Sequence, residues 1–454
     1  MTLNTKGLKK KRVGIITRRR FIKTTLTGAM LASAGGLIFP RYSAAKPKTL
    51  KIIQWLHYIP GYDKWFNESY VKEWGAKNDT EVTVDNISIA ALNARADAEA
   101  LTKRGHDLFL FMWPRPDMEQ YVIDHKDIYD ECIKTLGKPI DLAIGSSYNS
   151  KTKKYYGFSS SFVPGPVHYR KDLWDSVGIY PDTWDDVRLG GAKIKKKHNI
   201  SLGIGLASEI DTNMALRAIM YSFGSSVQDE EGNVILNSKE TLEAIKFVKA
   251  MYNESMTPEV FTWDASSNNR FMLTGKGSLT VNAISITRTA EKDNPEMGKK
   301  IWIAKTPKGP VCRMGLQHVM NVYAIWKFAE NIEGAKKFLV DYVSDFRKAF
   351  LASEFYNFPC FAKTVPDLKK QIAHDKMAHP PDKYKVLEDV QDWATNVGYP
   401  GYVNAAISEI FGKWVISDMF GRAASGKLSP EDALKAADKK VQASFKKWRA
   451  KGVL

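Results

Sequence analysis

Apolar, strand-like runs alternate with helical patterns along most of this 454-residue chain. The strand candidates are residues 50–55, 82–89, 107–113, 202–207, 278–282, 301–305 and 319–326. The main helical candidates between them are residues 91–104, 184–198, 239–253 and 332–351. This alternation favours an α/β architecture with largely parallel sheets. A chain of this length can bury two separate cores, so we expect two lobes.

The first 45 residues have the pattern of an export signal. Arg18 and Arg19 stand before Phe21 and Lys23, as in the twin-arginine signal, and small and apolar residues fill positions 26–39. Small residues at 43–45 offer a cleavage site. The apolar run is interrupted by glycines and is shorter than the about 20 residues that a membrane anchor needs. We therefore expect a cleaved signal over residues 1–45 and the twin-arginine export machinery as a partner.

The signal also explains most of the positive charge. The chain has 67 Lys and Arg against 50 Asp and Glu, and ten of the basic residues lie in residues 1–45. The remaining balance of 57 against 50 is +7, which gives no support for nucleic-acid binding. A basic nucleic-acid-binding arm, the alternative interpretation of the N-terminus, would lack the apolar core and the cleavage site.

Three cysteines, Cys132, Cys312 and Cys360, are far apart and form no CxxC motif. An odd count in an exported chain permits at most one disulfide, and the sequence leaves open whether one forms. None of them lies near residue 45, where a lipid anchor would be attached. We expect a periplasmic protein without a lipid anchor.

Two helix starts are marked by their own residues. Gly178 can take the left-handed conformation that ends a helix, Pro181 fixes a turn, and Asp182 or Thr183 can cap the helix beginning at 184. Near the C-terminus, residues 429–432 read Ser-Pro-Glu-Asp, a cap followed by a first-turn proline and two acids. Apolar residues at 434, 437, 441, 445 and 448 then form one buried stripe.

Residues 169–187 read YRKDLWDSVGIYPDTWDDV, and this segment resembles the family-1 extracellular solute-binding proteins of ABC importers, the maltose-binding type. Three further segments are similar to that family: DLFLF at 107–111, GKGSLTVN at 275–282 and ASGKLSPEDAL at 424–434. The matches are spread over nearly all of the chain beyond the signal.

The resemblance implies an α/β, two-lobed periplasmic-binding-protein fold, in which each lobe is a mainly parallel sheet flanked by helices and the lobes are joined by hinge strands. We assign residues 46–160 and 286–345 to lobe 1, and 161–285 and 346–454 to lobe 2. The expected crossings are residues 158–166, 282–287 and 342–350. The implied function is capture of a small solute, a carbohydrate or polyol, by hinge closure. A monomer that delivers this solute to the transmembrane subunits of an ABC permease is expected.

The chain contains none of the common catalytic motifs. Gly203-x-Gly205-x-x-Ser208 lacks the third glycine of a dinucleotide loop, and lone histidines such as His57 and His318 do not make a metal site. We therefore expect neither cofactor nor metal and no enzyme activity. A periplasmic glycoside-active enzyme, with Glu209 and Asp211 as acid and base, is the alternative.

Ligands of α/β proteins bind beyond the carboxyl ends of strands, so polar and aromatic residues at the predicted strand ends are the site candidates. A sugar offers an apolar face to aromatic rings and a rim of hydroxyls to polar groups. The candidates are Trp55, His57, Trp113, Arg115, Ser160, Glu209, Asp211, Asn282, Ser285 and Tyr402. Trp55 and Trp113 would cover the apolar face, with His57 and Arg115 as donors, Glu209 and Asp211 as acceptors, and Tyr402 opposite.

One departure from the family concerns the ligand. Maltose-binding proteins have a stacking tryptophan after the strand that matches residues 278–282, whereas Asn282 is followed here by Ala283. A cleft for maltodextrin is therefore not expected. Two other solutes stay open: a polyamine, which the Glu209 and Asp211 acids would favour, and a glycerol-phosphate-like solute, which Arg115 or Arg288 would favour.

Overall fold

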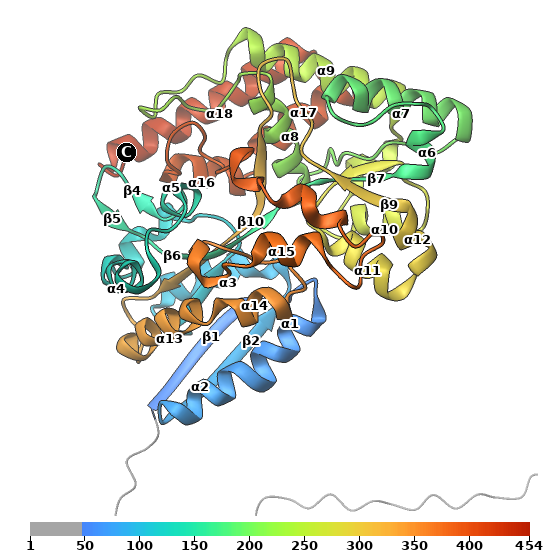
Figure 1. Ribbon diagram of the computed structural model, residues 1–454. Helices are drawn as coiled ribbons and strands as arrows, with labels where there is room; N and C mark the ends of the chain where they lie inside the picture. Colours follow the sequence, from blue (N-terminus) through green and yellow to red (C-terminus); the bar gives the residue numbers. More distant parts are fainter. Residues whose placement is uncertain (1–47) are drawn as a thin grey trace, which may run out of the picture. The chain divides into compact units, whose positions relative to one another are not determined.

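Two β-sheets organise the chain in the computed structural model, which describes residues 48–454; the predicted export signal lies outside the described residues (Figure 1). The larger sheet has seven strands in the order β11-β6-β10-β3-β1-β2, with β12 paired to β10. Its strands are β1 (Lys48–Trp55), β2 (Thr80–Ile87), β3 (Leu108–Phe111), β6 (Phe158–Pro164), β10 (Gly315–Ile325), β11 (Phe358–Pro359) and β12 (Ala394–Thr395). The smaller sheet has the order β8-β7-β9, with β7 (Val167–Arg170), β8 (Leu279–Val281) and β9 (Ile301–Ala304). A separate pair joins β4 (Tyr148–Asn149) and β5 (Lys154–Tyr155).

The α/β class is confirmed, but the strand directions correct the expectation of mainly parallel sheets. β1 is parallel to β2 and β3, whereas β10 is antiparallel to both β3 and β6. In the smaller sheet β7 is antiparallel to both of its neighbours. Local apolar patterns do not encode strand direction, because direction depends on how the connections route the chain between neighbours.

Helices cover both sheets. They are α1 (Pro60–Trp65), α2 (Val71–Lys77), α3 (Ile89–Thr102), α4 (Lys126–Leu136), α5 (Asp141–Gly145), α6 (Lys171–Asp175), α7 (Trp184–His198), α8 (Ile210–Ser222), α9 (Lys239–Ser255), α10 (Ser267–Leu273), α11 (Ser285–Asp293), α12 (Pro295–Lys300), α13 (Ile332–Ser344), α14 (Phe346–Ala352), α15 (Leu368–Ala373), α16 (Ala405–Gly412), α17 (Val415–Ala424) and α18 (Pro430–Ala450). Six short 3-10 or π-helical segments complete the part of the chain that the structure describes: η1 (Phe66–Tyr70), η2 (Pro116–Tyr121), η3 (Pro258–Thr262), η4 (Ala362–Thr364), η5 (Lys383–Leu387) and η6 (Val390–Asp392).

The predicted caps are present. Thr183 Oγ1 accepts from the Asp186 amide at 3.0 Å, and the Asp186 carboxylate accepts from the Thr183 amide at 3.0 Å, so a capping box starts α7. Gly178, in the turn that follows α6, has the expected left-handed φ of +66°. Ser429 caps α18, whose buried stripe packs against α9, α16 and α17.

Residues 202–207 form no strand, which corrects one sequence expectation. The segment is buried and donates backbone hydrogen bonds to three separate places, Ser255, Leu279 and Val260, so no continuous ladder develops. Gly203 lies so close to the rings of Phe271 and Trp263 that an added Cβ would approach each of them to 2.5 Å. Close packing of the backbone, and not strand pairing, explains the apolar character of this run.

Sheet membership shows where the chain passes from one sheet to the other. β6 ends in the larger sheet and β7 begins in the smaller one, within the expected first crossing at 158–166. Residues 282–287 are not a crossing, because β9 still pairs with β7, and the return to the larger sheet falls between β9 and β10. Residues 342–350 are not one either, since β11 and β12 still belong to the larger sheet. The lobe ranges themselves stay predictions.

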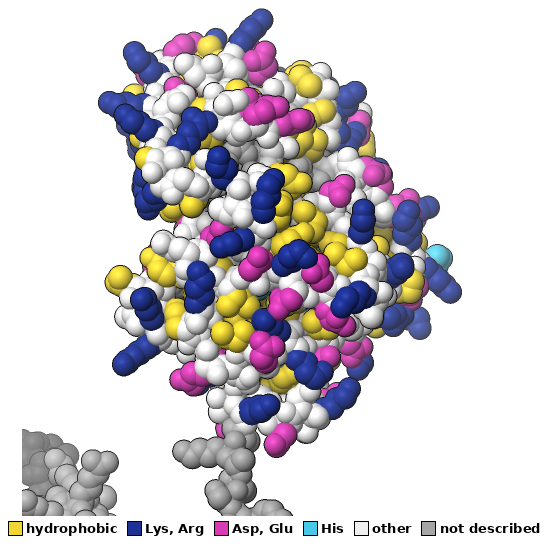
Figure 2. Space-filling model, turned by 90° about the vertical axis from the view of Figure 1, so that its left-hand side faces the viewer, with side chains coloured by type: hydrophobic (Ala, Val, Ile, Leu, Met, Phe, Trp, Pro, Cys, Tyr) yellow, Lys and Arg dark blue, Asp and Glu magenta, His cyan; other side chains and the backbone are white. Residues whose placement is uncertain are grey.

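The surface carries acidic as well as basic side chains, and the three cysteines are unpaired among residues 48–454. On the face in Figure 2, Asp and Glu side chains lie among the Lys and Arg side chains, without one large basic patch. Cys132, Cys312 and Cys360 are free thiols. No helix among residues 48–454 combines the length and the apolar character that crossing a membrane requires.

Candidate functional site

An aromatic wall follows the end of β1. The Trp55 ring stacks on His57, with centroids 4.6 Å apart, and lies 6.2 Å from Tyr58 and 6.4 Å from Tyr356. Trp55 is only 2% exposed, and its Nε1 donates to Asn321 Oδ1 of β10 at 3.2 Å. The end of β1 and the loop after it therefore place Trp55 and Tyr58 beside each other, and the ligand contact of Trp55 stays a prediction.

His57 is held by the protein itself. Its Nδ1 accepts from the Ile59 amide at 2.9 Å, and Nε2 faces Asn357 Oδ1 at 3.4 Å. Burial lowers the pKa of His57 to about 3, so the ring is neutral. Because both ring nitrogens already have partners, the predicted role of His57 as a donor to ligand receives no support from the geometry.

Glu209 starts α8 as its N-cap. Its carboxylate accepts from the backbone amides of Asp211, at 2.8 Å, and Thr212. Burial, and then the neighbouring Asp211 carboxylate, raise the pKa of Glu209 above its usual range. The side chain is thus occupied at the helix start, and its expected role as an acceptor of ligand hydroxyls is better explained as capping.

Asp211 faces away from the helix start toward other segments. Its Oδ1 lies 2.9 Å from Nε2 of His318 on β10, and its Oδ2 accepts from Asn268 Nδ2 of α10 at 2.6 Å. A carboxylate has about four lone-pair sites, so Asp211 can still accept from a ligand hydroxyl. Burial raises the pKa of Tyr58 to about 12, and the charge of Asp211 contributes in the same direction.

Asn282 and Ser285 are joined to this region through α10. Asn269 Oδ1 accepts from Asn282 Nδ2 at 2.5 Å, and Asn269 Nδ2 donates to Ser285 Oγ at 3.1 Å. Because Asn268 and Asn269 are consecutive, one turn of α10 connects Asp211 with Asn282 and Ser285. The structure therefore brings three of the predicted site residues into one polar network.

Trp113 and Arg115 lie beyond the end of β3. Arg115 is saturated by protein partners: it bonds Asp117 at 2.9–3.2 Å, Asn93 at 3.1 Å and Asp97 at 3.1 Å. Trp113 is buried, and its Nε1 has no partner among residues 48–454. Both line a cavity of about 320 Å³ together with residues of α16. Trp113 is therefore available for a ligand, and Arg115 is not.

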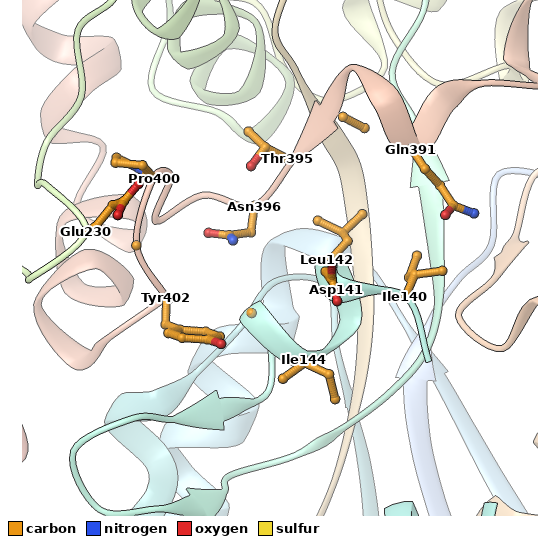
Figure 3. Close-up of a pocket in the computed structure, with 13 residues that line it drawn as sticks. Ile140, Asp141, Leu142, Ile144, Glu230, Gln391, Thr395, Asn396, Pro400 and Tyr402 are labelled. Carbon is orange, nitrogen blue, oxygen red and sulfur yellow. The ribbon is translucent and has the colours of Figure 1, made fainter. Parts of the chain in front are cut away.

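Ser160 and Tyr402 differ from the other candidates. Ser160 is buried in β6, and its Oγ donates to the Asn321 carbonyl at 3.4 Å. Tyr402 is 44% exposed and lines a cavity of about 660 Å³, which none of the other nine candidates lines. Figure 3 shows Tyr402 and α5 below Thr395 and Asn396 in this cavity. Tyr402 does not share the surface that carries Trp55.

Three polar contacts join segments predicted for different lobes. Tyr58 donates its hydroxyl hydrogen to the Ala265 carbonyl at 3.0 Å. Ser408 Oγ donates to Asp117 Oδ1 at 2.6 Å, and Asp211 meets His318 as described above. Of these contacts, the Tyr58–Ala265 bond brings the aromatic wall against the segment that leads into α10.

Three polar residues of this region, Asn268, Asn269 and Arg217, were not among the candidates predicted from the sequence. Asn268 and Asn269 lie in a short helix that the apolar pattern did not indicate, although adjacent asparagines before the strand at 278–282 were a visible signal. Arg217 is a lone arginine within an apolar helical run, and every residue of that helix, α8, is buried. A charge in such a run is a sequence signal of a buried site.

Comparison with known proteins assigns the family. The family model described as bacterial extracellular solute-binding protein matches residues 59–357, well over half of the chain. This chain belongs to the bacterial extracellular solute-binding proteins. The resemblance seen in residues 169–187 is thereby confirmed, and since the family consists of binding proteins, the glycoside-active enzyme alternative is set aside.

Individual extracellular solute-binding proteins are similar over most of this chain. A putative binding protein of Brucella abortus is 25% identical over 300 residues, covering 65% of this chain and 69% of that protein. The structure of maltose-bound MalE3 from T. maritima has a TM-score of 0.72 at 20% identity, covering 87% of this chain and 99% of that one. An ABC transporter solute-binding protein from Agrobacterium radiobacter K84, in complex with ribitol, has a TM-score of 0.68 at 16% identity, covering 87% and 98%. These structures support the two-lobed fold.

Proposed function

We propose that this protein captures a carbohydrate or polyol in the periplasm and delivers it to the transmembrane subunits of an ABC importer. The observation that carries the proposal is the Tyr58–Ala265 hydrogen bond, which joins the aromatic residues Trp55 and Tyr58 to the segment leading into α10, whose Asn268 donates to the carboxylate of Asp211. Aromatic rings cover the apolar face of a sugar ring, and carboxylates and amides bind its hydroxyls. The relatives with maltose and ribitol hold solutes of this chemistry.

Capture would proceed by hinge closure. The Tyr58–Ala265, Asp117–Ser408 and Asp211–His318 contacts join the predicted lobes, and each must open before a solute can reach Asp211. A solute that bonds groups on both sides stabilises the closed state and shifts the population toward it. The permease would recognise that closed state.

A polyamine is a weaker candidate. A polycation needs several converging carboxylates, but Glu209 is occupied by the α8 amides, so the predicted acid pair is reduced to Asp211. Arg115 and Arg288, the sequence candidates for a phosphate, are also engaged with carboxylates.

A thermal-shift screen of sugars and polyols tests the proposal, because a solute that binds only the native state raises the melting temperature. We expect at least one sugar or polyol to raise it in a concentration-dependent way, and the same solute to give a saturable heat in calorimetry. Stabilisation by spermidine or putrescine alone, with none from any sugar or polyol, would refute the carbohydrate assignment.

A further inference from the structure

Arg217 differs from the other buried arginines. Arg115, Arg170 and Arg288 each have carboxylate partners at 2.5–3.1 Å. Arg217 is 0% exposed, and no carboxylate of residues 48–454 forms an ion pair with it. Arginine stays protonated in proteins, so α8 holds a fully buried positive charge without a counter-ion in this part of the chain.

The donors that remain free lie on one edge of the Arg217 side chain. Nη1 donates to the Val397 carbonyl at 3.2 Å, and the guanidinium lies over the Phe411 ring at 5.4 Å. Nε and Nη2 have no partner among the described residues. These two nitrogens carry parallel N–H groups, the geometry that binds both oxygens of a carboxylate or phosphate. The Tyr221 hydroxyl nearby donates to the same Val397 carbonyl and, being neutral, cannot balance the charge.

Other buried polar atoms without hydrogen-bond partners lie around the Phe411 ring, the ring that the Arg217 guanidinium covers. Asn213, one turn before Arg217 on α8, donates from Nδ2 to the Phe411 carbonyl at 3.1 Å, while its Oδ1 has no partner within residues 48–454. Trp113, whose Nε1 is also unpartnered there, packs on Phe411 with centroids 5.1 Å apart. Buried polar atoms normally have partners, so this group around Phe411 has the character of a binding site.

Two cavities are lined by residues next to this group in the chain. Trp113 and Gly412, the residue after Phe411, line the cavity of about 320 Å³. Thr395 and Asn396, which precede Val397, line the cavity of about 660 Å³. Arg217 touches Val397 and Phe411, and the neighbour of each in the chain, Asn396 or Gly412, lines a cavity.

We propose that the captured solute carries an anionic group, a carboxylate or a phosphate ester, which binds the Nε–Nη2 edge of Arg217. The inference rests on the proposed function and narrows its solute class to acidic derivatives of sugars or polyols. An anion that arrives with the solute supplies the missing counter-ion only in the bound state, so its binding energy also favours closure. Asn213 and Trp113 then bind hydroxyl or ring oxygen atoms beside it.

Matched solute pairs test the charge requirement by calorimetry and thermal shift on the purified protein. The carboxylate arm compares galacturonate, glucuronate and gluconate with galactose, glucose and sorbitol. The phosphate arm compares glycerol 3-phosphate and glucose 6-phosphate with glycerol and glucose. We expect an acid in one arm to bind at least 100-fold more tightly than its neutral partner, and the arm identifies the anion. Tight binding by neutral members with none by any acid overturns this inference and leaves the proposed function intact; no acid binding at all also overturns it.

Variants of Arg217 test the residue. Arg217→Lys keeps the charge but loses the parallel donor edge, so affinity for the acid should fall at least 10-fold, and Arg217→Met should lower it at least 100-fold. Affinity for the neutral partner should change far less. The control Arg170→Lys, at the end of β7 beside Asp172, should leave acid binding unchanged. Unchanged acid binding by Arg217→Met overturns the proposal.

Stability without solute gives an independent readout. Removing an unpaired buried charge by an apolar residue of similar length should not destabilise the protein, so Arg217→Met should melt no lower than the parent. Arg288→Met, in contrast, should melt lower, because it leaves Asp375 unpaired and leaves Glu291 with Lys383 as its remaining cationic partner. A melting temperature of Arg217→Met as low as that of Arg288→Met, with acid binding retained, would assign Arg217 a structural role and overturn the proposal.

Discussion

Glu209 and Asp211 are two residues apart, yet their carboxylates bond to different parts of the protein. Glu209 is turned back onto the amides of its own helix, while Asp211 reaches His318 on β10 and Asn268 on α10. Sequence spacing cannot separate these roles, because both acids precede or begin the same helix. The structure separates them by the direction in which each side chain leaves the first turn of α8.

Asp211→Asn should weaken solute binding, and Glu209→Gln should not. Losing a carboxylate that accepts from a ligand hydroxyl costs about 1–3 kcal/mol, or roughly 5- to 150-fold in affinity. Glu209→Gln should instead lower the free energy of unfolding by about 0.5–2 kcal/mol through a weaker cap. Calorimetry and urea denaturation measure the two effects. An Asp211→Asn variant that binds solute as tightly as the parent would contradict the site.

Local residues explained several elements before any contact was known. The starts of α7 and α18 follow from Thr183 and Ser429, since a cap is a property of three or four neighbouring residues. The antiparallel smaller sheet and the unpaired segment at 202–207 could not be foreseen, because strand partners are chosen by contacts distant in sequence. Sequence patterns therefore placed several long helices and the strands β1, β2, β3, β8, β9 and β10, but not the shorter elements or the neighbours of each strand.

The turn between α6 and α7 needs a left-handed backbone at Gly178. Two glycine variants separate this requirement from the effect of an added methyl group. An added Cβ meets nothing within 4 Å at either Gly178 or Gly412, but only Gly178 has a left-handed φ, +66°. Gly178→Ala should therefore lower the free energy of unfolding by about 1–2 kcal/mol. Gly412→Ala, within α16, should leave it unchanged or raise it by about 0.5–1 kcal/mol. Equal effects in urea denaturation would contradict this account.

His125 joins two strands in its neutral form. Its Nδ1 donates to the Tyr155 carbonyl of β5 at 3.0 Å, and its Nε2 accepts from the Ile325 amide of β10 at 2.9 Å. Protonation would remove that acceptor. Burial lowers the pKa of His125 from 6.5 to about 4 in the folded protein.

Acid should therefore destabilise the fold through His125. Between about pH 4 and 6.5 the unfolded chain binds the proton and the folded protein does not, so stability is lost as the pH falls, by up to about 1.4 kcal/mol per unit. His125→Gln should reduce this slope in denaturation curves by one proton, although other buried histidines keep part of it. The surface variant His374→Gln is the control. An unaltered slope in His125→Gln would refute the assignment.

Some residues of the candidate site could be predicted from the sequence, whereas their partners could not. Trp55 and Trp113 are candidates because they follow the carboxyl ends of β1 and β3, the expected place for ligands, whereas Asp211 was chosen after a segment, 202–207, that forms no strand. The full saturation of Arg115 needs Asn93 and Asp97 besides the neighbouring Asp117, and the separate position of Tyr402 depends on distant segments, which no local pattern contains. Arg217 was visible in the sequence, but its lack of a counter-ion appears only in three dimensions.

Export of the whole chain is predicted to depend on Arg18 and Arg19. These residues occupy the two arginine positions of the signal in the part of the sequence that precedes the described residues. Changing both to Lys keeps the charge but breaks the pattern, and the chain should then stay in the cytoplasm. Cell fractionation measures this, with Lys9→Arg and Lys10→Arg as the control pair. Undiminished periplasmic protein in the double Lys variant would show that another route carries it.

Closure around a solute is the central claim, and small-angle X-ray scattering measures it most directly. In the proposed mechanism, the Tyr58–Ala265, Asp117–Ser408 and Asp211–His318 contacts belong to the closed state that a solute stabilises. With a saturating solute from the screen, the radius of gyration should fall relative to the solute-free protein, and Asp211→Asn should need more solute for the same decrease. Identical scattering curves with and without a solute that calorimetry shows to be bound would contradict capture by hinge closure.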